Sequence, residues 1–325
     1  MANRELKQVL IPEGLNGERV DAALSRVLGM SRTVATSLIE AGEVKRNGKG
    51  ITKSEKVLTG EHFEVLMPEV KVTGVLVPTP LPDLKVIFDD DDVIVIDKPV
   101  GVAAHASPGW HGPTVIGAII AAGYRVSTSG VAERQGIVQR LDVGTSGLMV
   151  VAKNEDSYSK MKDQFRNRAV NKIYHALIQG HMDPSEGTID APIDRHPRDD
   201  YKFAVIADGK ESITHYKAIE LFPAVSLLEV KLETGRTHQI RVHFSALRHP
   251  LVGDLIYGAD HTIAQRLELN RPWLHAGQLE FKHPRTGELL TFHSKYPKVE
   301  HLKILLVGKQ MIFVDNEFLF HYKSG

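Results

Sequence analysis

Asp142 is the residue of this sequence best placed for chemistry. It ends the expected strand 136–142 and precedes a short polar loop, 143–146, which leads into a second expected strand at 147–153. A side chain where a strand meets a loop can project into a cleft from a rigid scaffold. An ionised carboxylate there could attack a carbon atom or remove a proton. Taken alone, Leu-Asp-Val-Gly is more typical of a turn or a helix cap, so this position by itself assigns no reaction.

Arg241 is a second candidate, because it lies in a segment with helical spacing. Residues 237–247 carry apolar side chains at i, i+4 and i+7, namely Ile240, Phe244 and Leu247. This period predicts a helix with Thr237 as its N-cap. Arg241 then lies in the first turn, on a different face from the buried stripe. In isolation, such an arginine is typical of a surface salt bridge.

Three other polar groups do not predict a site. Asp89–Asp92 are four consecutive acids on an expected hairpin turn. They cannot all converge on one ion, so we expect a solvated turn. His238 and His243 would lie about 140° apart on a helix and on opposite faces of a strand, which excludes a shared zinc ion. Gly144–Gly147 lacks the G-x-S-x-G spacing of a nucleophile elbow, and no nucleotide-binding glycine motif is present. The sequence therefore predicts no metal and no cofactor.

The elements that position these residues begin with a small N-terminal unit, expected at 17–67 after an extension at 1–16. Two short amphipathic helices follow from apolar residues at helical spacing, with Ser31 as the N-cap of the second. Those apolar residues are Val20, Leu24, Val27, Val34, Leu38 and Ile39. An Asn47-Gly48 turn and a strand at 63–66 complete the unit. Four prolines, Pro68, Pro78, Pro80 and Pro82, then predict a linker at 68–83.

Residues 84–306 form the expected main domain. Strands are expected within 84–96 and at 136–142, 147–153, 173–179 and 226–232, and helices at 114–123, 157–168 and 237–247. The elements interleave without a regular βαβ rhythm, and hairpin-length connections are common. This predicts an α+β domain with a mixed, largely antiparallel sheet, beside a small α/β N-terminal domain. The apolar C-terminal segment, 307–325, has no assigned role.

Composition limits the classes of function. The chain has 325 residues, with 40 basic and 40 acidic side chains, so any surface that binds nucleic acid must be local. The absence of cysteine excludes disulfides, thiolate metal sites and a cysteine nucleophile. The N-terminus lacks the apolar run of a signal peptide, and the longest apolar stretch, 115–122, is too short to span a membrane. We therefore expect a cytoplasmic protein.

Four blocks of residues resemble, in order, the motifs of the RluA/RluD family of RNA pseudouridine synthases. The central one is GIVQRLDVGTSGLMVVAK at 136–153, with its Arg-Leu-Asp triplet and Thr-Ser-Gly-Leu turn. The others are Asp97-Lys98-Pro99 with Gly101, Lys172-Ile173-Tyr174, and LETGRTHQIRVHF at 232–244. The N-terminal unit resembles an S4 RNA-binding domain through Arg19-Val20-Asp21, Ser31-Arg32, Ala41-Gly42-Glu43-Val44 and Asn47-Gly48. One departure is Gln139, which stands where the family usually has histidine.

The resemblance implies a reaction that needs no cofactor. The bond from uracil N1 to the ribose breaks, the base turns, and it is rejoined through C5. The resemblance makes Asp142 the reacting carboxylate, either as a nucleophile or as the base that takes the C2′ proton. Arg241 would hold Asp142 ionised, typically lowering a carboxylate pKa by about 1–3 units, and Arg236 is either the alternative partner or a phosphate ligand. Tyr174 would stack on the target uracil and place its phenol near C5.

Further residues would bind the RNA. Arg140 resembles the family arginine that fills the gap left by the everted nucleotide, and Lys98 would either support the active-site loop or contact phosphate. In the S4-like unit the basic residues outnumber Glu43 and Glu55, and a contact with phosphate is expected. These basic residues are Arg32, Lys45, Arg46, Lys49, Lys53 and Lys56.

The layout favours structured large-subunit ribosomal RNA as the substrate, with transfer RNA as the alternative. A non-catalytic RNA-binding factor and a hydrolase are the alternative functions. The oligomeric state is not predicted.

Overall fold

The chain divides into two compact units, residues 1–73 and 74–325. The computed structural model describes residues 6–28, 30, 32–67, 78–82, 84–107, 110–129, 134–199, 201–267 and 269–297. The expected cap Ser31, most of the expected linker 68–83 and the segment 307–325 lie outside these residues. In the part of the chain that is described, no helix has the length and apolar character needed to cross a membrane.

The first unit is a four-stranded antiparallel sheet with two helices. Its strand order is β1(Leu6–Leu10)-β4(His62–Leu66)-β2(Val44–Arg46)-β3(Lys49–Gly50). The helices α1(Val20–Leu28) and α2(Arg32–Glu40) share a core with the sheet, and Phe63 and Val65 are fully buried in it. Asn47 and Gly48, at φ 52° and 75°, form the expected tight turn between β2 and β3.

Two expectations for this unit were wrong. Residues 6–15 are not an extension, because β1 pairs with β4 along its whole length and η1(Glu13–Leu15) buries Leu15. The apolar stripes of the helices are also narrower than expected, since Val27 and Val34 are exposed. The N-terminal residues contribute Val9, Ile11 and Leu15 to the core that the helices share with the sheet.

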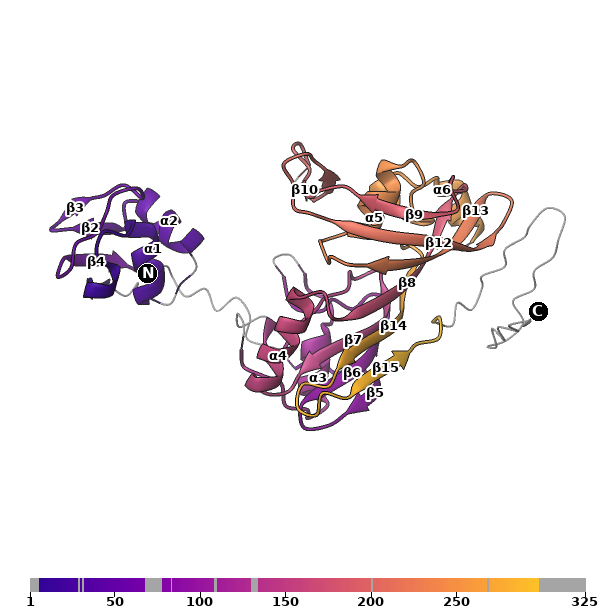
Figure 1. Ribbon diagram of the computed structural model, residues 1–325, viewed down its shortest axis with the longest axis horizontal. Helices are drawn as coiled ribbons and strands as arrows, with labels where there is room; N and C mark the ends of the chain where they lie inside the picture. The colour runs from indigo at the N-terminus through magenta and orange to yellow at the C-terminus, as the bar shows by residue number, and fades with distance from the viewer. Residues whose placement is uncertain are drawn as a thin grey trace. The chain divides into compact units, whose positions relative to one another are not determined.

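The second unit is built on one large sheet (Figure 1). The strand order is β5(Lys85–Asp89)-β6(Val93–Lys98)-β7(Ser146–Ala152)-β14(Leu274–Lys282)-β8(Asn171–Gln179)-β13(Val225–Leu232)-β12(Ile213–Leu221)-β9(Glu186–Asp190), and β15(Leu289–His293) pairs with β14. Only the β7–β14 pair is parallel among these described strands. A two-stranded ribbon, β10(Ile193–Arg195)-β11(Phe203–Val205), stands apart. The expected mixed, largely antiparallel α+β fold is confirmed.

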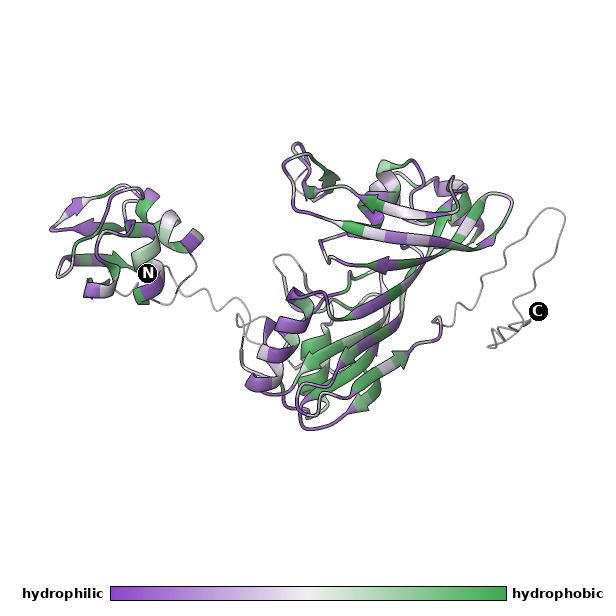
Figure 2. Ribbon diagram, in the orientation of Figure 1, coloured by the Kyte–Doolittle hydropathy of each residue, from purple (hydrophilic) through white to green (hydrophobic). Residues whose placement is uncertain are grey.

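Helices cover both faces of the sheet. Side chains of α3(Val115–Ala121) and α5(Gln239–Ala246) share a core with alternate residues of the central strands, such as Ile96 and Met149. On the other face, α4(Glu155–Arg166) packs on Val95 and Val150. The end of α6(His261–Arg266) also packs there, on β8 and β13. Because β6 and β7 are covered on both sides, they are continuous apolar runs, whereas α4 is largely hydrophilic (Figure 2).

The segment 136–142 is not the strand that we expected. Ile137 makes one isolated bridge to Val151, and the remainder is irregular up to β7. The apolar pattern misled the prediction, because Ile137 and Leu141 are buried in one core and Val138 in the other, which is the alternation that a strand also shows. The other strands and helices expected for this domain are confirmed within a few residues.

Candidate active site

A pocket lies where α5 meets the ends of β7, β8, β13 and β14. It is lined by Arg140, Leu141, Asp142, Thr145, Tyr174, Leu232, Arg236, His238, Gln239, Ile240, Arg241 and Leu274. The structure therefore brings together five of the expected residues from segments that are far apart in the sequence: Arg140, Asp142, Tyr174, Arg236 and Arg241.

Asp142 precedes β7 in a tight turn, in which the Thr145 N–H donates to the Asp142 carbonyl at 3.0 Å. The start of β7 approaches β14 closely at Gly147, whose φ is +111° and where a Cβ would lie 2.2 Å from the Ala276 carbonyl oxygen. Asp142 Oδ2 accepts a hydrogen bond from Arg241 Nη1 at 3.2 Å. Oδ1 has no hydrogen-bond partner within the described chain, and the side chain is 19% exposed. One carboxylate oxygen is held and the other is available.

Arg241 is buried between two carboxylates. Its Nε and Nη2 donate to Asp254 at 2.6 and 2.9 Å, and its guanidinium lies 4.8 Å from the centre of the Tyr257 ring. Burial alone would lower the pKa of Arg241, but the hydrogen bonds and charges of Asp254 and Asp142 keep it above its ordinary value. The arginine is therefore a fixed cation that orients Asp142.

The expectation for the helix around Arg241 was partly wrong. The N-cap residue of α5 is His238, not Thr237, and it makes no side-chain cap hydrogen bond. Arg241 is 6% exposed, whereas Leu247 is exposed. The helix is buried on two sides, since β10, β11 and η3(Leu255–Tyr257) also pack on it through Val242. A single apolar stripe was therefore the wrong pattern.

His238 lies beside Asp142, with its Nε2 3.8 Å from Oδ2. Its Nδ1 is 2.8 Å from the Tyr257 hydroxyl, and its ring makes edge contacts with Phe203 and Tyr257. Burial lowers the pKa of His238, and the nearby Arg241 and Arg140 lower it further, against the opposing charges of Asp142 and Asp254. The imidazole is therefore neutral at neutral pH.

Tyr174, on β8, lines the pocket and is 8% exposed. No described residue is a hydrogen-bond partner of its hydroxyl. Burial, and next the Asp142 carboxylate, raise the pKa of the phenol above its ordinary value. The phenol is therefore protonated at neutral pH and can donate a hydrogen bond.

Lys98 is not placed to contact phosphate. It is fully buried, and its Nζ donates to the carbonyls of Pro99, Val102 and Val143 at 2.9, 2.8 and 3.5 Å. Burial lowers its pKa to about 7. Lys98 therefore connects the loop that follows β6 with the loop that follows Asp142. Of the two expected roles, this contact pattern favours support of the active-site loop. Nearby Gln139 has a buried Nε2 without a partner among the described residues.

The basic residues of the first unit differ in how far they are neutralised. Arg32, with Arg19, forms an ion pair with the buried Asp21, and Arg46 pairs with Glu55 and Glu61. Hydrogen bonds from Arg19 help to hold the pKa of Asp21 at about 2. In the described part of this unit, three exposed lysines make no ion pair, namely Lys45, Lys49 and Lys56.

Reasoning from the sequence missed three residues of the site. Tyr257 and Asp254 were not considered, and His238 was weighed only as a metal ligand. Asp254 has a signal in retrospect, because it is one acid in the apolar run Leu251–Tyr257, and a buried acid must be paired. Its position also depends on Gly253, whose φ is +84° and where a Cβ would lie 2.0 Å from the Arg271 carbonyl oxygen.

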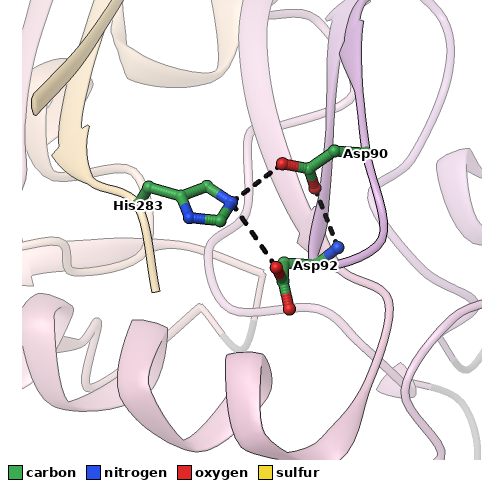
Figure 3. A group of neighbouring side chains, drawn as sticks. All are labelled: Asp90, Asp92 and His283. Atoms are coloured by element: carbon green, nitrogen blue, oxygen red, sulfur yellow. Dashed lines mark hydrogen bonds and ion pairs between the residues drawn. The ribbon is translucent and has the colours of Figure 1, made fainter. Parts of the chain in front are cut away.

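A second acidic cluster, Asp90, Asp92 and His283, has its side chains close enough to hold a cation (Figure 3). His283 Nδ1 accepts from the Thr286 N–H at 3.1 Å, so Nε2 carries the proton and donates to Asp90 at 2.8 Å. Arg285 Nε lies 2.7 Å from Asp92. The ligand atoms are thus engaged with protein donors, and the cluster carries no metal assignment. The expected solvated turn was wrong for Asp92, whose side chain is 6% exposed.

Comparisons with known proteins agree on one class of enzyme. The family model described as RNA pseudouridylate synthase matches residues 92–246. A Mycobacterium bovis protein named "Uncharacterized RNA pseudouridine synthase" is 53% identical over 307 residues, covering 94% of this chain and 99% of that protein. A Nitrosomonas europaea protein named "Ribosomal large subunit pseudouridine synthase D" is 38% identical over 301 residues, covering 91% and 86%. The structure of human RNA Pseudouridylate Synthase Domain Containing 1 matches with a TM-score of 0.54 at 29% identity, covering 68% of this chain and 86% of that one.

Proposed function

The chain belongs to the RluA/RluD family of RNA pseudouridine synthases, and we propose that it modifies uridines of structured large-subunit ribosomal RNA with Asp142 as the reacting carboxylate. Membership of the family makes the protein an enzyme that isomerises uridine to pseudouridine, rather than a binding-only factor or a hydrolase. Work on ribosomal RNA would place it in the cytoplasm.

The observation that carries the role of Asp142 is the inequality of its two oxygens. Oδ2 is held by Arg241, while Oδ1 has no hydrogen-bond partner in the described chain, and Asp142 lines the pocket. Because Oδ2 is held, the whole carboxylate is already oriented, and little free energy is needed to position Oδ1 when substrate binds. Oδ1 can therefore attack a ribose carbon or take the C2′ proton, and both routes leave the bonding electron pair of the glycosidic bond on the uracil.

The residues around Asp142 would bind an everted nucleotide. A base stacked inside an RNA duplex cannot reach the pocket, so the target uridine must leave the stack, at a cost of a few kcal/mol. Tyr174 lines the pocket and offers its aromatic ring and a phenolic donor to the uracil. Arg140 and Arg236 are exposed at the pocket. Arg140 would fill the gap that the everted base leaves in the RNA stack, and Arg236 would contact phosphate. Arg236 Nε already donates to the Glu211 carbonyl at 2.9 Å, which fixes its direction.

The first unit would act as an S4-like RNA-binding domain. Lys45, Lys49 and Lys56 supply charge that no described acid neutralises, and Arg32 remains 57% exposed although it pairs with Asp21. The names of two relatives, at 38% and 37% identity, support large-subunit ribosomal RNA as the substrate class.

Tritium release tests the catalytic assignment. Ribosomal RNA carrying tritium at uridine C5 should release label to water without any added cofactor. Asp142→Asn should slow single-turnover release by at least about 10³-fold, because the amide is neither a nucleophile nor a base. Its affinity for RNA should change little. Asp91→Asn is the matched control, since that side chain is 88% exposed and outside the pocket. Release by Asp142→Asn at the parent rate would refute the role.

Salt dependence tests the RNA-binding assignment. Replacing Lys45, Lys49 and Lys56 together by Gln should weaken RNA binding. It should also reduce the slope of log Kd against log salt by about 0.7–0.9 for each phosphate that these lysines neutralise in the parent. Lys160→Gln, on α4, is the control. An unchanged slope in the triple variant would contradict an RNA-binding role for this surface.

A further inference from the structure

His238 has a fixed backbone and a fixed ring. Its φ and ψ of 56° and 18° lie in the left-handed region, which costs a residue other than glycine about 1–2 kcal/mol. Such conformations persist where the surroundings impose them, often at functional sites. Here the ring makes T-shaped contacts with the rings of Phe203 and Tyr257.

The hydrogen bonds around Tyr257 determine which ring nitrogen of His238 carries the proton. The Phe203 backbone N–H donates to the Tyr257 hydroxyl at 3.1 Å. The hydroxyl proton has one acceptor among the described residues, His238 Nδ1 at 2.8 Å. Since Nδ1 accepts, the proton of the neutral ring is on Nε2.

The Nε2–H of His238 has no hydrogen-bond partner in the described chain. Asp142 Oδ2 lies 3.8 Å away, which is too far for a hydrogen bond, and that oxygen already accepts from Arg241. The His238 side chain is 20% exposed and lines the pocket. A neutral donor is therefore held beside the reacting carboxylate, on a residue that lines the pocket. A charged imidazolium would instead be drawn into an ion pair with Asp142.

We propose that His238 Nε2–H donates a hydrogen bond to the O2 carbonyl of the target uracil as the glycosidic bond breaks. When C1′–N1 cleaves, its electron pair passes to the uracil and spreads over N1, O2 and O4. O2 is the oxygen next to N1, so it lies on the side of the base nearest the ribose and Asp142. A preorganised donor at a developing oxyanion commonly contributes about 10²–10³-fold in rate. No proton is transferred, and the inference rests on the proposed role of Asp142.

A chemical double-mutant cycle tests the contact. Sulfur accepts hydrogen bonds poorly, so 2-thiouridine at the target position should slow the parent enzyme by about tenfold in single turnover, the worth of one hydrogen bond. His238→Asn tolerates the left-handed backbone but carries its amide near the position of Nδ1, short of the pocket. It should react about 10²–10³-fold more slowly than the parent. With this variant the 2-thio penalty should disappear, while the penalty of 4-thiouridine, the matched control, should stay the same.

Two further variants make the result decisive. His238→Gln carries its amide near the position of Nε2 and should recover at least about tenfold over His238→Asn. Tyr257→Phe keeps the ring under Arg241 but removes the hydroxyl that fixes the tautomer, so the 2-thio penalty should shrink in it. This variant keeps the inference testable if His238→Asn does not fold.

A parent enzyme without a 2-thio penalty would overturn the inference, as would a penalty that persists in His238→Asn. Asp142→Asn, assayed in parallel, separates the two claims. If that variant is inactive and the cycle shows no coupling, only the His238 contact fails. If it is active, the proposed function fails.

Discussion

The same combination of four residues, drawn from three residue types, occurs twice in the second unit, with opposite outcomes. The Arg241 network consists of Asp142, Asp254, Arg241 and His238, and the turn cluster consists of Asp90, Asp92, Arg285 and His283. Each contains two aspartates, one arginine and one histidine. Residue types and proximity alone therefore do not identify an active site.

The two groups differ in what remains unpaired. In the turn cluster, Asp92 Oδ1 accepts from Asn154 and Ser157 at 3.0 and 2.8 Å, and its Oδ2 lies 2.7 Å from Arg285. These contacts fasten the β5–β6 turn to the start of α4 and to the β14–β15 turn. In the Arg241 network, Asp142 Oδ1 and His238 Nε2 have no hydrogen-bond partner within the described chain, and both belong to pocket-lining residues. An active site keeps hydrogen-bonding capacity for a substrate, whereas a structural network uses all of it.

Asp254→Asn should have the largest effect of the three changes that separate the groups. Asp254 is 1% exposed, is not among the residues that line the pocket, and forms an ion pair with Arg241. Removing one charge of a buried pair costs about 3–5 kcal/mol, and we expect about 3 kcal/mol because Asp142 remains as a partner. Arg241 would then shift, and misplacement of about 1 Å can cost about 10²-fold in rate. Urea denaturation and single-turnover release measure the two effects. Parent-like activity would show that Arg241 needs no second carboxylate.

Asp92→Asn should lower stability without lowering the rate. The amide cannot satisfy the guanidinium of Arg285 and the donors Asn154 and Ser157 together, so the free energy of unfolding should fall by about 1–3 kcal/mol. Activity, measured well below the melting temperature, should stay within about twofold. Asp91→Asn should leave both unchanged within about 0.5 kcal/mol. A rate loss in Asp92→Asn that exceeds its loss of folded protein would mean that the turn cluster reaches the active site.

The two groups also show where prediction from the sequence ends. Strands covered on both faces, such as β6 and β7, are continuous apolar runs and could be predicted. Asp142 and Arg241 were identified through the resemblance, and in the structure Arg241 Nη1 lies 3.2 Å from Asp142 Oδ2. Asp92 was misjudged, because its burial depends on α4 and Arg285, which are distant in the sequence. Contacts of this kind depend on tertiary packing, which no local period reports.

Acid should lower the stability of the protein through the two groups in different pH ranges. This effect should be the smallest of the three changes. Although burial raises the pKa of Asp92, hydrogen bonds from Asn154, Arg285 and Ser157 bring it below 3.8. Its stabilisation is therefore complete above the unfolded pKa and is lost as pH falls through the lower folded value. The stability gap between the parent and Asp92→Asn should stay constant above about pH 5 and narrow below about pH 4.

His238 has its pKa lowered from 6.5, mainly by burial, so the unfolded chain takes up the proton first. The parent should therefore lose stability relative to His238→Asn as pH falls below 6.5. Urea denaturation from about pH 7.5 to about pH 3.5 resolves the two windows, and a common window would mean that the groups unfold as one network.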